Sequence, residues 1–233
     1  NNFISFEKYI EHLITEYFHF TSRIISNKKR KIKIPKDFKP PPHLEYGYKN
    51  LINKVEAGED LFSHLSRQMK KANFFDGLLF DWNIFHFHLG FNEDKKYKSM
   101  VEGTKEVLYA VVTDEYFYIL DISDHNWANR KYLEVLEENY PQLLKIFEVN
   151  NLTPEKFSTN DIIHLRKNGL NYLTELNGKG YKFGPMYSTS RLNMLGVLVY
   201  DKTFLFFELV TKFLNNNSFN IEKAIFINFK KNI

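Results

Sequence analysis

Residues 105 to 123, KEVLYAVVTDEYFYILDIS, form the segment that most constrains the fold of this chain. Two runs rich in Val, Tyr and Ile flank Thr113, Asp114 and Glu115, and this pattern predicts two strands joined by a tight turn. Strands joined by so short a connection pair in antiparallel fashion, because a parallel pair requires a long crossover. The chain must therefore build part of its core on an antiparallel sheet.

The N-terminal region predicts a helix followed by an extended connector. Apolar residues recur at helical spacing between Phe3 and Ile25, which indicates one amphipathic helix. The basic segment that follows, SNKKRKIKIPKDFKPPPH, ends in three consecutive prolines that no helix can accommodate. We therefore expect residues 1–43 to form an N-terminal helix and connector, and residues 44–233 to form a single domain.

Helices and short strands are mixed along the rest of the chain. Gly58 should end a first short helix, and Asp60 should cap a second one within LFSHLSRQMKK. Further helices are expected over residues 129–144, with a bend or an end at Pro141, and over residues 154–166 and 190–214. Strands are expected over residues 78–89, on both sides of a glycine turn within residues 170–190, and over residues 223–231. Helices followed by a largely antiparallel sheet with inserted helices define an α+β fold.

Composition limits the classes of function. The 233 residues include no cysteine, which excludes disulfides, thiolate catalysis and cysteine-based zinc sites. A net charge of +4 permits contact with nucleic acid without requiring it. The first twenty residues are interrupted by charged side chains and fit neither a signal peptide nor a membrane span. We therefore expect a cytoplasmic protein with no membrane partner, and the sequence leaves the oligomeric state open.

The stretch FDWNIFHFHLG, residues 80 to 90, carries the strongest candidate for a site. It places His86 and His88 within a run that predicts a strand, so both side chains lie on one face, about 6 to 7 Å apart. A buried imidazole needs a polar partner. The pair can therefore be a general base and a general acid, two ligands of one metal, or two core histidines with satisfied hydrogen bonds.

The segment DISDHNW follows the second strand of the hairpin, at a strand end of the kind that often carries functional groups. If this strand lies beside the first, His125 completes a catalytic set with His86 and His88, and no cofactor is needed. Alternatively, the three histidines hold a divalent metal together with Asp121 and Asp124, although the spacing matches no specific metal signature. For Asp124 by itself, capping of the following helix is the preferred explanation.

A glycine-rich basic segment, ELNGKGYKFGPMYSTSR, supplies candidate contacts to a substrate. Its glycines allow the backbone to approach a ligand closely, and its Ser/Thr run predicts a helix N-terminus, which favours phosphate. No Walker-type pattern occurs, so nucleoside triphosphate binding is not indicated. A plain hairpin followed by a helix cap is the simpler explanation of the segment. The candidate substrate-binding residues are Lys179, Tyr181, Lys182 and Arg191, with Arg166 as a further cation near a predicted helix C-terminus.

The segments DGLLFDWNIFHFHLG, VLYAVVTDEYFYILDISDHNW and LEENYPQLL together resemble a group of uncharacterised bacterial proteins, of the kind carried by mobile elements or phage-defence systems. In that group the comparable motif reads Asp-Trp-Gly-Ile-His-His-Leu-His-Leu, and a strand pair ending in a histidine follows it. The resemblance runs from about Asp76 to Leu144 and matches His86, His88 and His125. The chain departs from the motif where it has Phe85 for histidine and Asn83 for glycine. The resemblance implies a defence-like context and no particular activity.

Three functions from different classes are compatible with these residues. The one we favour is a metal-independent endoribonuclease of toxin or antiviral-defence type, with His86 as base and His88 or His125 as acid for attack by the RNA 2′-hydroxyl. Its partners would be RNA and either an antitoxin or a phage protein. The second is a metal-dependent hydrolase or nuclease with a His/Asp site. The third is a non-enzymatic sensor or interaction protein of a defence system, in which the histidines are structural.

Overall fold

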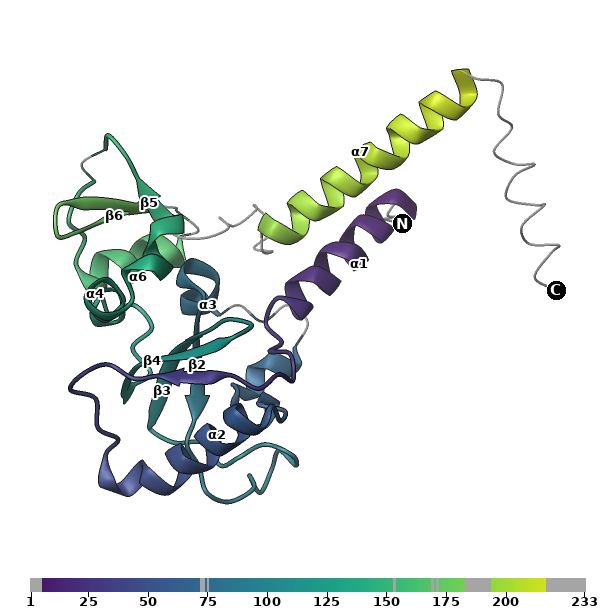
Figure 1. The fold of residues 1–233 in the computed structure, drawn as a ribbon. Coiled ribbons are helices and arrows are strands. Elements are labelled where there is room, and N and C mark those ends of the chain that lie inside the picture. Colours follow the sequence, from purple (N-terminus) through teal and green to yellow (C-terminus); the bar gives the residue numbers. More distant parts are fainter. Residues whose placement is uncertain are drawn as a thin grey trace.

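The computed structural model describes residues 6–71, 74, 76–152, 154–168, 170, 172–182 and 194–216. Helices are combined with a mixed four-stranded sheet and a small antiparallel sheet, which confirms the α+β class. Figure 1 shows a body that contains both sheets, and two helices, α1 (Phe6–Thr21) and α7 (Met194–Asn216), that extend away from it. The candidate site belongs to the body.

The larger sheet has the strand order β1-β4-β3-β2. The expected hairpin is present as β3 (Glu106–Val112) and β4 (Tyr116–Asp124), and β2 (Ile84–His88) pairs antiparallel with the other edge of β3. β1 (Lys31–Lys33) comes from the basic connector and pairs in parallel with β4. The connector thus supplies an edge strand of the main sheet.

Two apolar clusters cover the two faces of this sheet. On one face, Leu51 and Val55 of α2 (Glu45–Ala57) belong to the same cluster as Phe87 of β2. The other face packs against α4 (Lys131–Asn139). Because side chains alternate along a strand, β2 directs its two histidines toward this second face.

The prediction of a strand over residues 78–89 is wrong for its first half, where the helix α3 (Gly77–Trp82) precedes β2. The Asp76 side chain caps this helix by accepting a hydrogen bond from the Leu79 N–H, at 3.2 Å. The helix ends at Asn83, whose φ of 58° is the left-handed conformation common at helix ends. A short apolar run has the same composition in a buried helical turn and in a buried strand, so periodicity alone does not separate them.

The smaller sheet has the strand order β5-β7-β6 and is antiparallel throughout. β6 (Leu173–Leu176) and β7 (Lys179–Lys182) form the expected hairpin, and Gly178 has a φ of 80° in the turn between them. β5 (Glu148–Val149) pairs with the other edge of β7.

Several expected helices are present with different bounds. The helix expected over residues 129–144 is divided at Pro141 into α4 and α5 (Pro141–Leu144), as anticipated. The helix expected from residue 154 begins later, as α6 (Thr159–Lys167), because Ser158 forms a capping box with Asp161.

The first short helix, α2, ends at Gly58 as expected, where φ is 77°. The prediction of a second short helix is wrong, because that segment forms two 3₁₀ turns, η2 (Phe62–His64) and η3 (Arg67–Lys70). Asp60 nevertheless accepts a hydrogen bond from the Phe62 N–H at 2.9 Å. The remaining 3₁₀ turns are η1 (Pro42–Leu44) and η4 (Lys145–Phe147).

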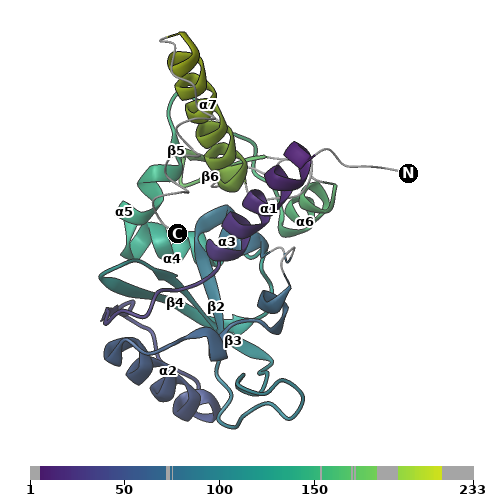
Figure 2. The same cartoon turned by 90° about the vertical axis from the view of Figure 1, so that its right-hand side faces the viewer.

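α7 packs along α1, and Figure 2 shows both helices on the side of the body opposite to α2. The expected helices over residues 3–25 and 190–214 are thus present with somewhat different bounds. In the part of the chain that the structure describes, no helix combines the length and the hydropathy that a membrane span requires. The strand expected over residues 223–231 lies outside the described residues.

Candidate active site

Two histidines of β2 and one that directly follows β4 meet on the α4 side of the main sheet. His86 lies opposite Tyr109 of β3 in the strand register, and His88 lies two residues further along β2. His125 follows the last residue of β4, as expected from the hairpin. The ring centroids are 6.2 Å apart for His86 and His88, 6.1 Å for His86 and His125, and 5.3 Å for His88 and His125.

The three rings differ in their access to solvent. His88 is buried, with 7% of its surface exposed, whereas His125 is exposed and the His86 side chain, at 17%, lies between them. The cluster therefore runs from the protein interior to the surface. A substrate group that reached His125 would also come close to the other two rings.

Asp76 fixes the ring of His86. Its Oδ2 lies 3.1 Å from the Nδ1 atom of His86, while its Oδ1 caps α3 through the Leu79 N–H. Burial lowers the pKa of His86, but the charge of Asp76 and its hydrogen bond to the ring outweigh burial, and the pKa of His86 is raised above its ordinary value. The protonated imidazolium of His86 is therefore stabilised relative to that of an ordinary histidine.

The ring of His88, in contrast, is held in the neutral state. Its Nδ1 accepts a hydrogen bond from the Thr104 N–H at 3.2 Å, so a neutral ring carries its proton on Nε2. Burial lowers the pKa of His88 to about 3, and positive charge at His86, His125 and Arg67 adds to the effect. His88 is thus a neutral hydrogen-bond donor over the physiological pH range.

His125 is held by the backbone carbonyl of Lys105, the residue directly before β3. Its Nδ1 lies 2.9 Å from the carbonyl oxygen of Lys105, to which only a protonated Nδ1 can donate. The Tyr109 hydroxyl donates to the carbonyl oxygen of Asp124 at 2.8 Å and so holds the residue directly before His125. A neutral His125 ring therefore presents an unprotonated Nε2.

Each ring is oriented through Nδ1 by a different partner: a carboxylate, a backbone N–H and a backbone carbonyl. Within the described residues, no protein group forms a hydrogen bond with the Nε2 atom of any of the three rings. The site thus offers three distinct nitrogens: Nε2–H of a cation at His86, Nε2–H of a neutral ring at His88, and an Nε2 lone pair at His125. That set can donate and accept protons at one place.

The same contacts argue against the metal alternative. A metal ligand must present an unprotonated nitrogen, and the neutral His88 ring presents Nε2–H. Asp121 pairs with Lys131 at 2.8 Å, and the Asp124 side chain is exposed. Among the residues that the structure describes, no group of three or more histidine and carboxylate side chains is arranged to hold a metal ion.

The expected substrate-binding residues are not gathered around the histidines by any contact that the structure records. Arg166 pairs with Asp81 of α3, and both side chains are buried, at 3% and 4% exposed, so Arg166 is not free to meet a substrate at the surface. Lys179 lies 4.0 Å from Glu137 of α4, and the buried Tyr181 donates to the same carboxylate at 3.3 Å.

The other two candidates, Lys182 and Arg191, also belong to the basic segment. Lys182 is an exposed residue at the end of β7. Arg191 lies outside the described residues.

Asp76, Tyr109 and Arg67 are site residues that sequence reasoning missed. Arg67 lies against Gly103, where an added Cβ would come within 2.5 Å of its Nη1, and its charge lowers the pKa of His88. It also pairs with Asp94. The sequence did carry a signal for Asp76, because an aspartate just upstream of an apolar run is typical of a helix N-cap.

The chain was compared with models of protein families, with curated proteins and with solved structures, and none of them matches it. The assignment of a function therefore depends on the geometry and chemistry of the histidine cluster.

Proposed function

We propose that His86, His88 and His125 form an acid–base site, and that the protein is a metal-independent endoribonuclease of toxin or antiviral-defence type. The observation that carries this proposal is that three imidazole rings, each held through Nδ1 by a different partner, have centroids within 6.2 Å of one another. A general acid and a general base must be present together and in opposite protonation states. Histidine meets that requirement near neutral pH, because its reference pKa is about 6.5.

The three roles follow from the three nitrogens. His125 Nε2 accepts the proton of the RNA 2′-hydroxyl as its oxygen attacks the adjacent phosphorus. The bond from phosphorus to the 5′-oxygen breaks, and His86 Nε2–H donates its proton to that departing oxygen. His88 Nε2–H donates a hydrogen bond to a non-bridging phosphate oxygen, whose negative charge grows in the transition state. The products are a 2′,3′-cyclic phosphate and a 5′-hydroxyl.

These roles reverse the assignment expected from the sequence, which made His86 the base. The pairing with Asp76 supports His86 as the acid, because a neighbouring carboxylate favours the protonated ring. The Lys105 carbonyl supports His125 as the base, because it orients the lone pair of Nε2 away from itself. His88, with a pKa of about 3, is too weak a base to take the proton.

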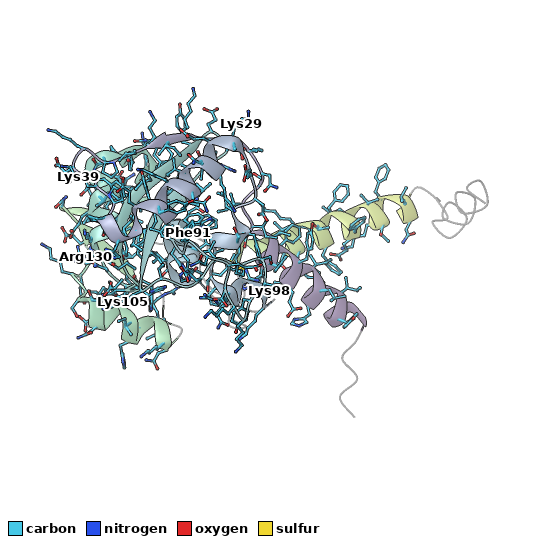
Figure 3. The ribbon with its side chains drawn as sticks, turned by 90° about the horizontal axis from the view of Figure 1, so that it is seen from below. Lys29, Lys39, Phe91, Lys98, Lys105 and Arg130 are labelled. Carbon is cyan, nitrogen blue, oxygen red and sulfur yellow. The ribbon has the colours of Figure 1, made fainter. Side chains whose placement is uncertain are left out.

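Positive charge next to the histidines can attract the phosphate backbone. Lys105 is exposed and contributes the carbonyl that holds His125, and Figure 3 shows its side chain on the same side of the view as Arg130. The charge of Arg67 also acts on His88 electrostatically. These cations take the place that the sequence assigned to Arg166.

The experiment is cleavage of cellular RNA, and of single-stranded DNA, in the presence of EDTA. We expect RNA to be cut and DNA to remain intact, because DNA lacks the 2′-hydroxyl. His86→Gln and His125→Gln should each lower the rate by about 10²- to 10⁴-fold, the usual contribution of a general acid or base. His12→Gln is the matched control, because His12 is exposed on α1 and pairs with Glu16 of the same helix.

Each contrary result identifies a different function. Cleavage that occurs only when a divalent metal is supplied would contradict the acid–base roles and favour a metal-dependent nuclease. Absence of cleavage under both conditions would contradict an enzymatic function and favour a sensor whose partner is an antitoxin or a phage protein. Detection of 3′-phosphate ends without any cyclic intermediate would contradict attack by the 2′-hydroxyl.

A further inference from the structure

The positive charge of this chain is concentrated in the connector between α1 and α2. Residues 28–39 contain seven lysines and arginines and one aspartate, whereas the whole chain has 32 basic and 28 acidic residues. The remaining residues therefore carry 25 basic and 27 acidic side chains, so the connector accounts for all of the net positive charge. We call five of its exposed lysines the basic edge: Lys29, Lys31, Lys33, Lys36 and Lys39.

No carboxylate neutralises the lysines of the basic edge. Lys28, just before them, pairs with Asp114 at 2.9 Å, but none of the five forms an ion pair within the described part of the chain. Neighbouring lysines of the row are two or three residues apart, which is roughly 7–10 Å in an extended chain. This spacing is within about one Debye length at 0.1 M salt, so their charges repel one another. A bound polyanion would relieve that repulsion.

The backbone that carries the basic edge is fixed by the fold. β1 pairs with β4, and the buried Arg30 lies within the same segment. Its guanidinium donates hydrogen bonds to the backbone carbonyl oxygens of Ser26, Lys28 and Thr113, at 2.6 to 3.0 Å. The charges are therefore arranged in advance on an ordered element, which lowers the entropic cost of binding a ligand.

Protection of the sheet edge explains only part of this charge. Lysine on an edge strand discourages pairing with other chains, but β1 contains only two of the five lysines, Lys31 and Lys33. The other three lie outside the strand. In Figure 3, Lys29 and Lys39 lie toward the upper margin of the body, whereas Lys105, next to the histidine cluster, lies toward the lower margin. The basic edge is thus a surface separate from the candidate active site.

β4 connects the basic edge with the histidine cluster. Tyr116, its first residue, lies opposite Lys31 in the strand register, and His125 directly follows its last residue. The nine residues of β4 span about 30 Å at roughly 3.3 Å per residue. At the rise of about 3.4 Å per nucleotide in a stacked strand, that distance corresponds to roughly nine nucleotides. Only a substrate at least that long can contact both places.

We propose that the basic edge binds the phosphate backbone of RNA and is a second contact for long substrates, remote from the histidine cluster. A row of like charges along one margin suits a linear polyanion, whose binding is favoured by the release of condensed counterions. The inference rests on the proposed function for the identity of that polyanion as RNA. The binding itself does not depend on cleavage, so the two can be tested separately.

The first measurement is the binding of a fluorescent single-stranded DNA, followed by anisotropy at several salt concentrations. A probe of about 20 nucleotides is long enough, and it lacks the 2′-hydroxyl that the proposed cleavage requires. The triple variant Lys29→Gln/Lys36→Gln/Lys39→Gln removes three charges and keeps both lysines of β1. It should weaken binding at least about tenfold near 0.1 M salt and make the slope of log K against log salt shallower by about two, since each phosphate contact contributes about 0.7.

The matched control is Lys145→Gln/Lys167→Gln/Lys202→Gln, which removes three exposed lysines from η4, α6 and α7. The net charge changes equally, but the affinity and the salt slope should stay as in the native chain. A native chain that does not bind the probe, or equal losses in the two triple variants, would overturn the proposal. Binding to vesicles that contain phosphatidylserine, lost in the first variant and without any binding to DNA, would overturn it in favour of a membrane surface.

Cleavage then separates this inference from the proposed function. On a long RNA the variant of the basic edge should raise KM and leave kcat unchanged, whereas a dinucleotide, too short to reach the basic edge, should be cut equally by the variant and the native chain. Slower cleavage of the dinucleotide would contradict a remote contact. A native chain that binds DNA through the basic edge but cuts no RNA would contradict only the proposed function. RNA cleavage by a chain whose binding does not depend on the basic edge would contradict only this inference.

Discussion

The short helix α3 carries two carboxylates whose surroundings differ. Asp76, at its start, contacts His86, and Asp81, near its end, pairs with Arg166. The side chains of Asp81 and Arg166 are 4% and 3% exposed, whereas those of Asp76 and His86 are 8% and 17% exposed. We call these the sealed pair and the open pair.

The difference between the pairs is one of chemistry as well as burial. A guanidinium stays protonated at every accessible pH, so the sealed pair is a fixed structural contact between α3 and α6. An imidazole gains and loses its proton near neutral pH, and the ring of His86 lies beside two further histidines. A carboxylate on the same helix thus supports the fold in one case and tunes a reactive group in the other.

The largest expected loss of stability comes from breaking the sealed pair. Arg166→Leu removes the guanidinium and leaves the Asp81 carboxylate buried, which should lower the free energy of unfolding by about 3–5 kcal/mol. Urea denaturation measures it. The double variant Asp81→Leu/Arg166→Leu should recover most of the loss, because it removes both charges. A loss below about 1 kcal/mol in the single variant would show that the pair is not a structural contact.

A second buried histidine should make the fold sensitive to acid. His64 is fully buried, and burial lowers its pKa to about 4. The unfolded chain binds a proton at His64 below pH of about 6.5, but the folded chain does so only near pH 4, so stability falls as the pH drops through this interval. The shift corresponds to about 3 kcal/mol at most.

His64→Asn tests that contribution. The asparagine amide can replace Nδ1–H as the donor to the His88 carbonyl, which lies 2.8 Å from Nδ1, and it does not titrate. The variant should therefore lose less stability than the native chain between pH 7 and pH 4 in urea denaturation. Parallel losses in the two proteins would contradict the buried neutral state of His64.

A substitution in the open pair should lower the activity more than the stability of the protein. Asp76→Asn keeps the cap of α3, since asparagine caps as well as aspartate, but removes the charge beside His86. We expect a loss of about tenfold or more in RNA cleavage. The alkaline limb of the pH–rate profile should move to lower pH, because the pKa of His86 falls. An unchanged limb would contradict His86 as the acid.

The same substitution has a pH-dependent effect on stability. The pKa of His86 is raised in the folded state, so its pairing stabilises the fold fully below pH of about 6.5. This contribution to stability is lost as the pH rises through the raised pKa. The deficit of Asp76→Asn in thermal unfolding should therefore be larger at neutral pH than at alkaline pH. A deficit that grows with pH would contradict the pairing of Asp76 with a protonated His86.

The smallest effect is expected at Tyr109. Tyr109→Phe removes the hydroxyl that holds the Asp124 carbonyl and so loosens the position of His125. We expect a loss of about 1 kcal/mol in stability, typical of one hydrogen bond, and a few-fold fall in kcat with little change in KM. A fall in cleavage as large as that of His125→Gln would make Tyr109 a catalytic residue.

The part of the site that sequence reasoning identified depends on local rules. His86 and His88 share a face because they lie two apart in a strand, and His125 joins them because the hairpin brings the end of β4 beside β2 through β3. Both relations follow from short-range pairing. Strand alternation and hairpin geometry were therefore sufficient to predict that the three rings lie close together.

The parts that were missed depend on contacts that no local pattern encodes. Asp76 meets His86 only because α3 folds between them, and an apolar run of that length does not reveal whether it is helix or strand. β1 joins the sheet by parallel pairing across more than eighty residues of sequence, a pairing that depends on tertiary structure. Arg166 was expected to contact a substrate, but its side chain is buried against Asp81. This pairing could not be predicted, because the two residues are far apart in sequence.

The most direct test of the proposed site is an NMR titration of the histidine ring nitrogens in the native chain. We predict that His86 is doubly protonated at neutral pH and titrates above the ordinary value, whereas His88 is neutral, carries its proton on Nε2 and stays neutral to about pH 3. Neutral His125 should carry its proton on Nδ1. Three rings that titrate together near pH of about 6.5 would contradict the division into acid, donor and base.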